Sequence, residues 1–487
     1  MDITSSFKDI EFRNFIIQTY CDGEAIKKSD VEHITEMVIP QQSYFISEND
    51  KGELVTNMTS GFPIHSLEGI EHFTALEILI CSHNKTIEKW DLSNNKNLKI
   101  FHCSNNNFTE LYINEAGIEE LDCSHNPLIG LPLHKFPDLK ILNCGVCKIS
   151  EISLENNLLL EILICRYNPL ESIDISNNPN LKVLDCNSTK LLQYLHTDKN
   201  TNLEELDCGF NALSNLDTRS LTNLKKLVCY HNKLTELNLS ENKQLEYLSC
   251  MTNLLTHLDI SCNTKLTNLD CSSNQLKSLD ISKNINLKTL DCNNNQLTEI
   301  DLTKNTELTI LKVFNNKLTE IDISQNKMME RFICSDNKLT IVPDTSENKL
   351  ISYFSYTGNP IIEPDHTIKG VGTFVYDNSS IEYGLESDGF HITVNVSNLA
   401  GIKRLSATIK KVIANLNNFK TQIIEFLKKN YPEEDSSGLV FQLIVFEPNK
   451  TFKLAYDAGD SPAGRLYLYF EFDKNMSLKE EIIYETY

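Results

Sequence analysis

Cysteine is the residue type in this chain with the widest potential chemistry. There are fifteen cysteines among 487 residues, and a thiol can form a disulfide, bind zinc or act as a nucleophile. Cys144 and Cys147 have the spacing C-x-x-C, but a zinc site needs four ligands, and the periodic pattern described below accounts for both positions. No cysteine follows Cys334, so the last part of the chain has no cysteine nucleophile. We therefore expect neither a metal site nor cysteine catalysis.

A second candidate for chemistry is the carboxylate pair Asp457 and Asp460, in the stretch YDAGDSPAG. Two carboxylates can act as general acid and base, but Gly459, Pro462 and Gly464 favour a tight turn at this place. The sequence contains no phosphate-binding loop, kinase signature, H-E-x-x-H or G-x-S-x-G. These observations predict a protein without catalytic activity and without a cofactor, and an enzyme using the two aspartates remains an alternative.

Most of the cysteines recur at a nearly fixed interval, which indicates an internal repeat. Successive members of this ladder are 20 to 22 residues apart, and Val313 occupies the single gap in register. The ladder consists of Cys81, Cys103, Cys123, Cys144, Cys165, Cys186, Cys208, Cys229, Cys250, Cys271, Cys292 and Cys334.

The clearest unit, LTNLDCSSNQLKSLDISKN, runs from Leu266 to Asn284. On an extended strand Leu269 and Cys271 point inward and Asp270 points outward. Asn274 lies where the chain must turn, and its amide can bond backbone groups there. The same role is expected for Asn84, Asn106, Asn126, Asn168, Asn211, Asn232, Asn253, Asn295, Asn316 and Asn337, with Cys147 and Thr189 as replacements.

This unit resembles the leucine-rich-repeat consensus, with Cys in place of the third Leu, and the 21-residue period is similar to that of bacterial internalin-like repeats. The resemblance covers residues 61–364. It implies an α/β solenoid that is rich in β-structure, a right-handed superhelix of about 14 coils. A chain of this kind needs caps at its ends.

The two ends differ in pattern from the repeats. Residues 1–60 predict a helical N-terminal cap, with one helix around Phe12, Phe15 and Ile16 and another from Ser29 through Val38. Residues 365–385 are interpreted as a linker, and residues 386–487 as a small α+β domain. The stretch YDAGDSPAGRLYLYFEFD in this domain has a distant resemblance to small bacterial immunity-type proteins, which implies toxin neutralisation as an alternative function.

The repeat also predicts which side chains are available to a partner, since strands stacked in one parallel sheet expose the positions one and three before each ladder cysteine and the two after it. Aspartates and aromatic residues gather at these positions, although ordinary solvated positions would give a similar pattern. The candidate binding residues are Asp122, Arg166, Tyr167, Asp185, Asp207, Phe210, Tyr230, His231, Tyr247, Asp270, Asp291 and Phe314.

An apolar set precedes these residues along the repeats: Ile78, Ile80, Ile100, Ile141, Ile162, Ile164 and Val183. If exposed, it would form either a protein-binding site or a surface covered by the amino-terminal segment.

The charge of the chain limits the partners that it can bind. Lys and Arg total 45 against 67 Asp and Glu, a net charge of −22, which disfavours nucleic acid and anionic membranes and favours a protein with a basic surface. The absence of a signal-peptide pattern and of an 18-residue apolar run, together with cysteines read as reduced, predicts a cytoplasmic protein. Secretion without a signal peptide is an alternative. We expect a non-enzymatic scaffold that binds protein on its concave face.

Overall fold

The computed structural model describes residues 1–40, 43–48, 54–60, 63–88, 90–113, 117–361, 366–377, 380, 382–387, 389–396, 399–432, 439–461 and 464–486. The chain divides into two compact units. The first comprises Met1–Lys312, Ile323–Arg331 and Asn348–Leu350, and the second comprises Val313–Asp322, Phe332–Glu347 and Ile351–Tyr487. The second unit thus takes in the last repeats, whereas the sequence placed a boundary at residues 364 and 365.

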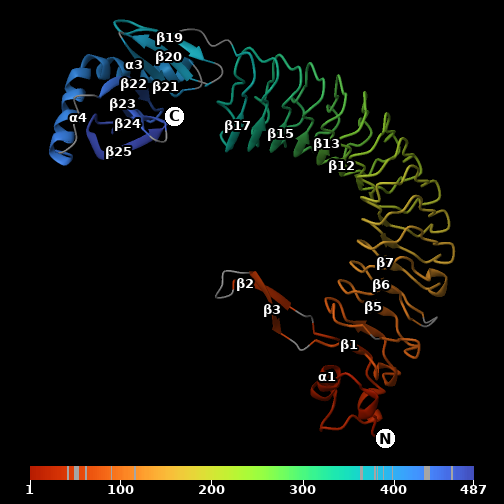
Figure 1. The fold of residues 1–487 in the computed structure, drawn as a ribbon. Helices are drawn as coiled ribbons and strands as arrows, with labels where there is room; N and C mark the ends of the chain where they lie inside the picture. The colour runs from red at the N-terminus through yellow and green to blue at the C-terminus, as the bar shows by residue number, and fades with distance from the viewer. Residues whose placement is uncertain are drawn as a thin grey trace. The chain divides into compact units, whose positions relative to one another are not determined.

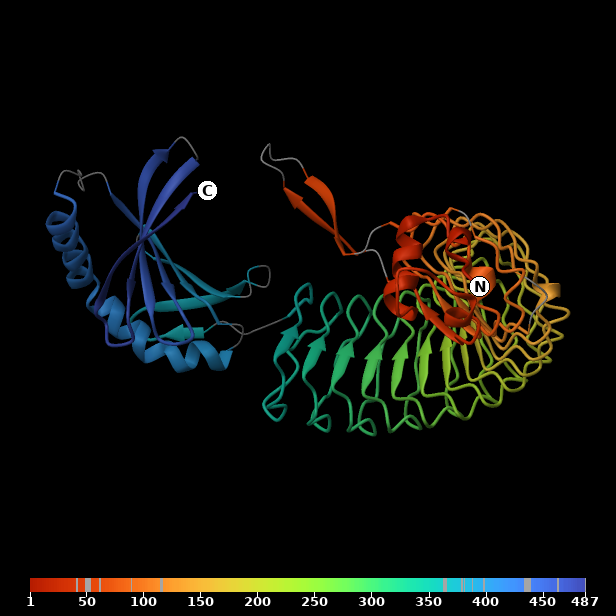
Figure 2. The same ribbon diagram turned by 90° about the horizontal axis from the view of Figure 1, so that it is seen from below.

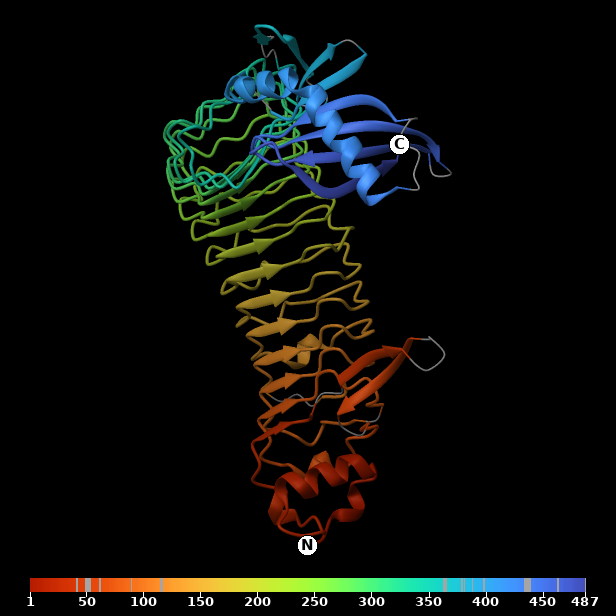
Figure 3. The same cartoon turned by 90° about the vertical axis from the view of Figure 1, so that its left-hand side faces the viewer.

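The repeats form one sheet of fifteen short strands in the order β1, then β4 to β17. Neighbours from β1 to β15 pair in parallel, one strand per coil (Figures 1 and 3). The strands are β1 (Glu36–Val38), β4 (Ile78–Ile80), β5 (Ile100–His102), β6 (Glu120–Asp122), β7 (Ile141–Asn143), β8 (Ile162–Ile164), β9 (Val183–Asp185), β10 (Glu205–Asp207), β11 (Lys226–Val228), β12 (Tyr247–Ser249), β13 (Asn268–Asp270), β14 (Thr289–Asp291), β15 (Ile310–Lys312), β16 (Arg331–Ile333) and β17 (Tyr353–Ser355). This is the parallel solenoid that the period predicts.

The ladder cysteines fill the interior of the coils. Each of them is buried, as is the leucine or phenylalanine two residues before it. All fifteen cysteines lie in the part of the chain that the structure describes, and none of them forms a disulfide. Burial raises the pKa of the ladder thiols, for Cys81 to about 12 and for Cys271 well above the ordinary value. A buried neutral thiol behaves as a small hydrophobic group and is chemically inert.

The predicted asparagines join each coil to the one before it. Asn274 donates from Nδ2 to the carbonyl oxygens of Cys250 and Cys271, at 3.0 and 3.1 Å, and accepts at Oδ1 from the backbone N–H of Leu255 at 3.0 Å. The residue before it, Ser273, has a φ of 54°. A left-handed backbone conformation is unfavourable for residues other than glycine. These hydrogen bonds therefore stabilise a turn that is otherwise strained.

A second asparagine ladder runs through the other half of the coils, at the position where the repeat ends in Ser-x-Asn. Asn284 is fully buried and donates from Nδ2 to the carbonyl oxygens of Ile260 and Asn263, at 3.0 and 2.9 Å. The two ladders satisfy backbone groups of coils that have few strand hydrogen bonds.

The amino-terminal segment is less helical than the sequence predicts. A 3-10 turn η1 (Thr4–Ser6) precedes α1 (Ile10–Tyr20). Asp9 is the N-cap of α1, and its side chain accepts from the N–H of Phe12. The expected second helix shrinks to the single turn α2 (Lys28–Val31), and β1 follows. The prediction of a helix through Val38 is wrong, because Met37 is buried and β1 pairs with β4.

An antiparallel pair, β2 (Ser43–Glu48) and β3 (Leu54–Ser60), follows β1 within the first 60 residues. Two further 3-10 turns belong to the repeats, η2 (Ile70–His72) and η3 (Leu133–Lys135).

The remaining elements form an eight-stranded sheet with two helices on one side of it (Figure 2). They are β18 (His366–Ile368), β19 (Gly372–Asp377), β20 (Glu382–Ser387), β21 (Phe390–Val394), α3 (Leu399–Ala414), α4 (Leu416–Asn430), β22 (Val440–Phe446), β23 (Phe452–Ser461), β24 (Gly464–Phe472) and β25 (Leu478–Thr486). Neighbouring strands are antiparallel except β21 and β22, which α3 and α4 connect. This is the expected α+β domain.

The interpretation of residues 365–385 as a linker is wrong, because β18, β19 and β20 belong to the eight-stranded sheet. Phe374 and Tyr383 are buried in the core that also holds Ile392 and Phe446. Among the described residues, no helix is both long and apolar enough to cross a membrane.

Candidate binding face of the repeats

We define the concave face as the outward side chains of β4 to β15 together with the two residues that follow each ladder cysteine. In most of these strands the middle residue is buried and at least one flanking residue is half-buried or exposed, as in Asn268, Leu269 and Asp270. The alternation that the sequence predicts is therefore present. It places the candidate residues on one surface, which lines the inner side of the curved stack of coils (Figure 1).

The aspartates of this face have a structural task that the sequence did not reveal. In each of them Oδ1 accepts the backbone N–H two residues further on, at 3.0 Å from Ser124 to Asp122 and 3.1 Å from Gly209 to Asp207. Asp185, Asp270 and Asp291 make the same contact. One carboxylate oxygen of each is therefore used inside its own coil, where it supports the left-handed turn.

Burial also limits how far these carboxylates are open to a partner. Asp122, Asp185, Asp207 and Asp270 are half-buried. Asp291 is only 8% exposed, since Asn293 and Lys312 cover it, with 2.9 Å from Lys312 Nζ to its Oδ2. The prediction that the whole aspartate column is open is wrong at Asp291.

Burial, together with the neighbouring charges, shifts the pKa of two of these aspartates. Burial raises the pKa of Asp185, and the carboxylate of Asp207 adds to the rise, while the N–H of Asn187 and the guanidinium of Arg166 lower it. The Arg166 guanidinium lies 3.5 Å from the Asp185 carboxylate. Burial likewise raises the pKa of Asp270, with a smaller contribution from the neighbouring Asp291.

Aromatic side chains gather over β9 to β12. The ring of Phe210 meets His231 edge-on at 4.0 Å between centroids and Tyr230 at 6.1 Å. Asn187 donates from Nδ2 both to the Tyr230 hydroxyl at 3.1 Å and to Asp207 Oδ1 at 2.9 Å. Tyr230 therefore reaches back over two coils, and a hydrogen-bond network fixes its position. We call Arg166, Asp185, Asn187, Asp207, Phe210, Tyr230 and His231 the central cluster.

Glycines make room for the large members of this cluster. A Cβ on Gly209 would lie 2.8 Å from Cε1 of Tyr230, and a Cβ on Gly145 would lie 3.2 Å from Cγ of Arg166. Gly209 and Gly145 each follow a ladder cysteine directly. In the next coil the same position is occupied by Tyr230 and by Arg166, respectively. Asn187 and these glycines are site residues that the sequence analysis missed, and a glycine followed one coil later by a bulky residue is the signal that indicates them.

Two of the other candidates lie beside the central cluster, and the remaining four lie further away along the strand order. Tyr167 and Tyr247 are 55% and 39% exposed, next to the cluster at the ends of β8 and β12. Asp122 belongs to β6, and Asp270 and Asp291 belong to β13 and β14. Phe314 lies in the second unit, where it is half-buried.

A ladder of alternating charges precedes the strands and was not expected from the sequence. The residue immediately before strands β4 to β12 is in turn acidic and basic: Glu77, Lys99, Glu119, Lys140, Glu161, Lys182, Glu204, Lys225 and Glu246. Each lysine pairs with the glutamate of the preceding coil, at 2.9, 2.5, 2.6 and 2.6 Å. These pairs are exposed, so each contributes little stability, but they neutralise four of the five glutamates along this edge of the face.

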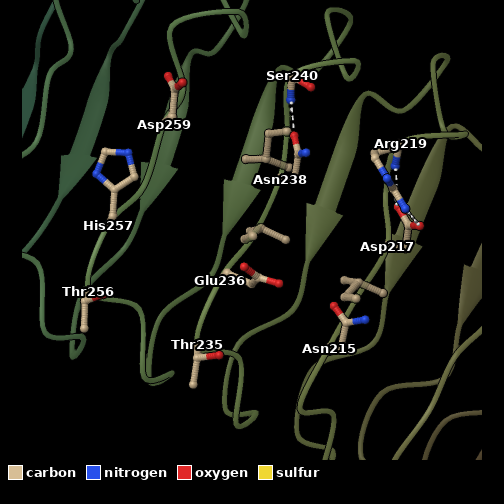
Figure 4. A pocket seen from close by; sticks show the side chains of 13 residues that line it. Asn215, Asp217, Arg219, Thr235, Glu236, Asn238, Ser240, Thr256, His257 and Asp259 are labelled. Carbon is tan, nitrogen blue, oxygen red and sulfur yellow. Dashed lines mark hydrogen bonds and ion pairs between the residues drawn. The ribbon is translucent and has the colours of Figure 1, made fainter.

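An open hollow lies on the side of the coils away from the strands (Figure 4). Asn215, Glu236 and His257 come from successive coils, and Arg219 binds Asp217 through Nε at 2.9 Å and Nη2 at 2.6 Å. The guanidinium lowers the pKa of Asp217 to about 2. A carboxylate that stays ionised and paired does not act as a general acid, so Asp217 is not a candidate for that role.

The carboxylate candidate of the second unit is also held by an arginine. Asp457 is 4% exposed, accepts at Oδ1 from the N–H of Gly459 at 2.8 Å, and accepts at Oδ2 from Nε of Arg465 at 2.8 Å. The hydrogen bonds from Arg465 lower its pKa. It joins the two strands of the β23–β24 hairpin. The side chain of Asp460 lies outside the described residues.

Comparisons with known proteins agree with this geometry. Residues 264–304 match a family described as leucine-rich repeats in two copies. Among solved structures, the functional domain of InlJ from Listeria monocytogenes, described as including a cysteine ladder, is 30% identical. The match covers 75% of this chain and 72% of that one, with a TM-score of 0.60. A search of curated protein sequences finds no match.

Two further structures share the fold alone. The internalin InlF from Listeria monocytogenes is 20% identical over 72% of this chain and 94% of its own, with a TM-score of 0.53. The ectodomain of the Arabidopsis thaliana receptor kinase GASSHO1/SCHENGEN3 was solved in complex with CASPARIAN STRIP INTEGRITY FACTOR 2. It is 22% identical, and the match covers 60% of this chain and 42% of that one, with a TM-score of 0.51.

Proposed function

This chain belongs to the internalin-like leucine-rich-repeat proteins, and from that premise we propose that it is a non-enzymatic scaffold whose concave face binds a protein partner. The observation that carries the proposal is the central cluster. Aromatic residues and arginine contribute most of the energy at protein interfaces. Here they stand together on one surface, next to the exposed Tyr167 and Tyr247.

The arrangement of the cluster is favourable for binding because its parts are held before a partner arrives. Asn187 fixes the Tyr230 hydroxyl and the Asp207 carboxylate together, and Gly209 lets the tyrosine ring lie across the preceding coil. A side chain that is already ordered loses little conformational entropy on binding. The cluster therefore suits an interface hot spot.

Charge supports a partner with a basic surface. The chain carries a net charge of −22, and each aspartate of the cluster keeps an oxygen outside its own turn. A cation placed near Asp185 would also relieve the unfavourable burial that raises its pKa. Opposite charges on the partner would speed association and exclude acidic competitors.

Catalysis has no such support. Asp457, which an enzyme hypothesis needs, is bound by Arg465 and Gly459, and among the described residues no group of three or more His, Cys, Asp or Glu could hold a metal ion.

Quantitative affinity capture with the full chain tests the proposal. The test variant carries Tyr167→Ala, Phe210→Ala and Tyr247→Ala, three exposed residues of the concave face. The control carries Ile129→Ala, Tyr194→Ala and Leu254→Ala, which are comparably exposed but lie off this face. We expect recovery of the bound protein to fall at least tenfold with the test variant and to stay unchanged with the control. Equal recovery with both variants would contradict the proposal.

A further inference from the structure

An apolar strip lies on the concave face before the central cluster. It consists of Ile78, Ile80, Ile100, Ile141, Ile162, Ile164 and Val183, which belong to β4, β5, β7, β8 and β9. Each of them is half-buried, so each keeps part of its apolar surface in contact with solvent. Unlike the ladder side chains, none of these residues is fully buried. The strip therefore remains available for contact.

The register of the strands aligns this strip across the sheet. Ile78 is the parallel partner of Ile100, and Ile141, Ile162 and Val183 are partners in three successive strands. Neighbouring strands lie about 4.8 Å apart, so the apolar groups repeat at that spacing along the stack, perpendicular to the strands. Five such steps from β4 to β9 give a length of about 24 Å.

The second outward position of these strands is apolar only at Ile80 and Ile164 and is polar at His102, Asp122, Asn143 and Asp185. At the first outward position the strip is interrupted at one strand, β6. There Glu120 and Asp122 occupy the two outward positions that are filled by Ile78 and Ile80 on β4. The Glu120 carboxylate contacts Nε2 of His102 at 2.7 Å. Glu120 stays half-buried between apolar neighbours, because Ile100 and Ile141 are its partners in the adjacent strands.

We propose that this strip binds an amphipathic α-helix of the partner, laid along the stack, with one lysine or arginine in its apolar stripe. Side chains three and four apart on a helix are separated by about 5–6 Å, which matches the spacing of the strands. A length of about 24 Å corresponds to about 16 helical residues. The basic residue meets Glu120 and Asp122, about two helical turns from the end of the helix over β4.

Charge complementarity is the argument for this occupant. His102 and the Ser124 N–H each bond one carboxylate oxygen, of Glu120 and of Asp122 respectively. A purely apolar helix would still bury these two neighbouring carboxylates without a cation at their other oxygens, which is costly, and an acidic helix would add repulsion. A basic side chain satisfies both carboxylates and leaves the rest of the stripe apolar. Recognition of an amphipathic helix by an apolar groove is a common mode of peptide binding. The strip adjoins the central cluster at β8 and β9, where Ile164 is the strand partner of Asp185. The inference therefore adds to the proposed function a second contact beside the first.

A displayed library of 18-residue helical peptides is the probe. Its stripe positions are randomised among Leu, Ser, Lys and Glu, and it is selected on the full chain. We expect the selected peptides to carry leucines with one basic residue between them, and never glutamate at that place. Selection of peptides without a basic residue, or of none, overturns the proposal.

Variants of the chain then locate the contact by fluorescence anisotropy with one selected peptide. The pair Ile141→Ser and Ile162→Ser should weaken binding at least tenfold. Ile310→Ser is the matched control, since it occupies the same position on β15, and should leave binding unchanged. Glu120→Lys should reverse the preference, so that the peptide with Glu in place of its basic residue binds more tightly. Binding that is the same in all variants overturns the proposal.

Two more measurements distinguish a helix bound on the strip from binding at the central cluster and from self-association. The variant Tyr167→Ala, Phe210→Ala and Tyr247→Ala should still bind the peptide. A failure of the proposed function can therefore be distinguished from a failure of the proposal that the strip binds a helix. Analytical ultracentrifugation should show the wild-type chain to have the same mass as the Ile141→Ser and Ile162→Ser variant. Self-association that is lost in that variant would show that a second copy occupies the strip, and would overturn the proposal.

Discussion

The asparagine that links successive coils should have a large effect on stability, and Asn274→Ala is the substitution that measures it. In the wild-type chain Asn274 is 9% exposed and bonds four backbone groups. It accepts from the N–H of Leu255 and shares its two amide hydrogens among the carbonyl oxygens of Cys250, Cys271 and Ser272. The carbonyl oxygens of Cys250 and Cys271 each keep a second donor, Asn253 or Asn295. The N–H of Leu255 loses its partner altogether.

The size of the loss follows from this inventory. A buried N–H without a partner costs about 1–3 kcal/mol, and each of the two lost carbonyl bonds contributes about 0.5–1.5 kcal/mol. The free energy of unfolding should therefore fall by about 2–6 kcal/mol. Asn286→Ala is the matched control, because Asn286 is exposed and makes a single bond to the carbonyl oxygen of Thr264. It should cost about 1 kcal/mol or less.

Urea denaturation followed by circular dichroism gives both values, and hydrogen exchange at Leu255 reports the opened amide directly. A second substitution, Asn274→Asp, keeps the acceptor for Leu255 but removes the donor to the carbonyl groups. It should be more destabilising than alanine at pH 7 and should partly recover at acidic pH, where the protonated acid can donate. A loss below about 1 kcal/mol for Asn274→Ala, equal to that of the control, would refute the reasoning.

Three further outcomes are expected. Burial raises the pKa of Asp270 in the folded chain. The neutral form therefore stabilises the fold below the pKa that Asp270 has in the unfolded chain, and this stabilisation is lost as the pH rises through its pKa in the folded chain. Asp270→Asn should thus raise the melting temperature at pH 7 and have no such effect near pH 3; a pH-independent effect would contradict this. Thiol titration of the native chain should label Cys262, the exposed cysteine, quickly, and the buried ladder only after unfolding; fast reaction of the ladder would count against burial. Gly209→Ala should displace Tyr230 and weaken partner binding about tenfold while the chain stays folded; unchanged affinity would show that the position of Tyr230 does not matter.

The sequence predicts the solenoid well, for a physical reason. A period of about 21 residues places like residues above one another, so each column is repeated many times. The inward Leu269 and Cys271 and the turn asparagine Asn274 follow directly from the alternation of a strand and from the hydrogen-bonding capacity of an amide. The structure confirms these roles.

Contacts between coils are harder to predict. Whether the Tyr230 side chain extends over Gly209 to Asn187 depends on its direction across neighbouring coils. The alignment of repeat positions in the sequence does not show that direction. The aspartates show the same limit, since their position facing solvent is visible in the sequence but their bond to the N–H two residues ahead requires the left-handed turn. Two of the twelve candidates, Tyr230 and Asp207, are joined by Asn187, which the sequence did not single out.

Tertiary pairing explains the errors at the two ends. The stretch around Met37 has apolar residues at helical spacing, but strand β4 offers an edge, and pairing with it buries Met37. Residues 366–377 contain Gly370, Gly372 and Asp377, residue types that favour turns and linkers. Phe374 nevertheless gives β19 a buried side chain and joins it to the sheet.

Site-specific photo-crosslinking tests the central claim most directly. A photoreactive phenylalanine analogue replaces Phe210 in the central cluster or, as the control, Tyr194 on the opposite side of the coils. The complex of each variant with the captured partner is then irradiated. The account predicts a crosslink to the partner from position 210 and none from position 194. A crosslink from position 194 alone would contradict binding by the concave face.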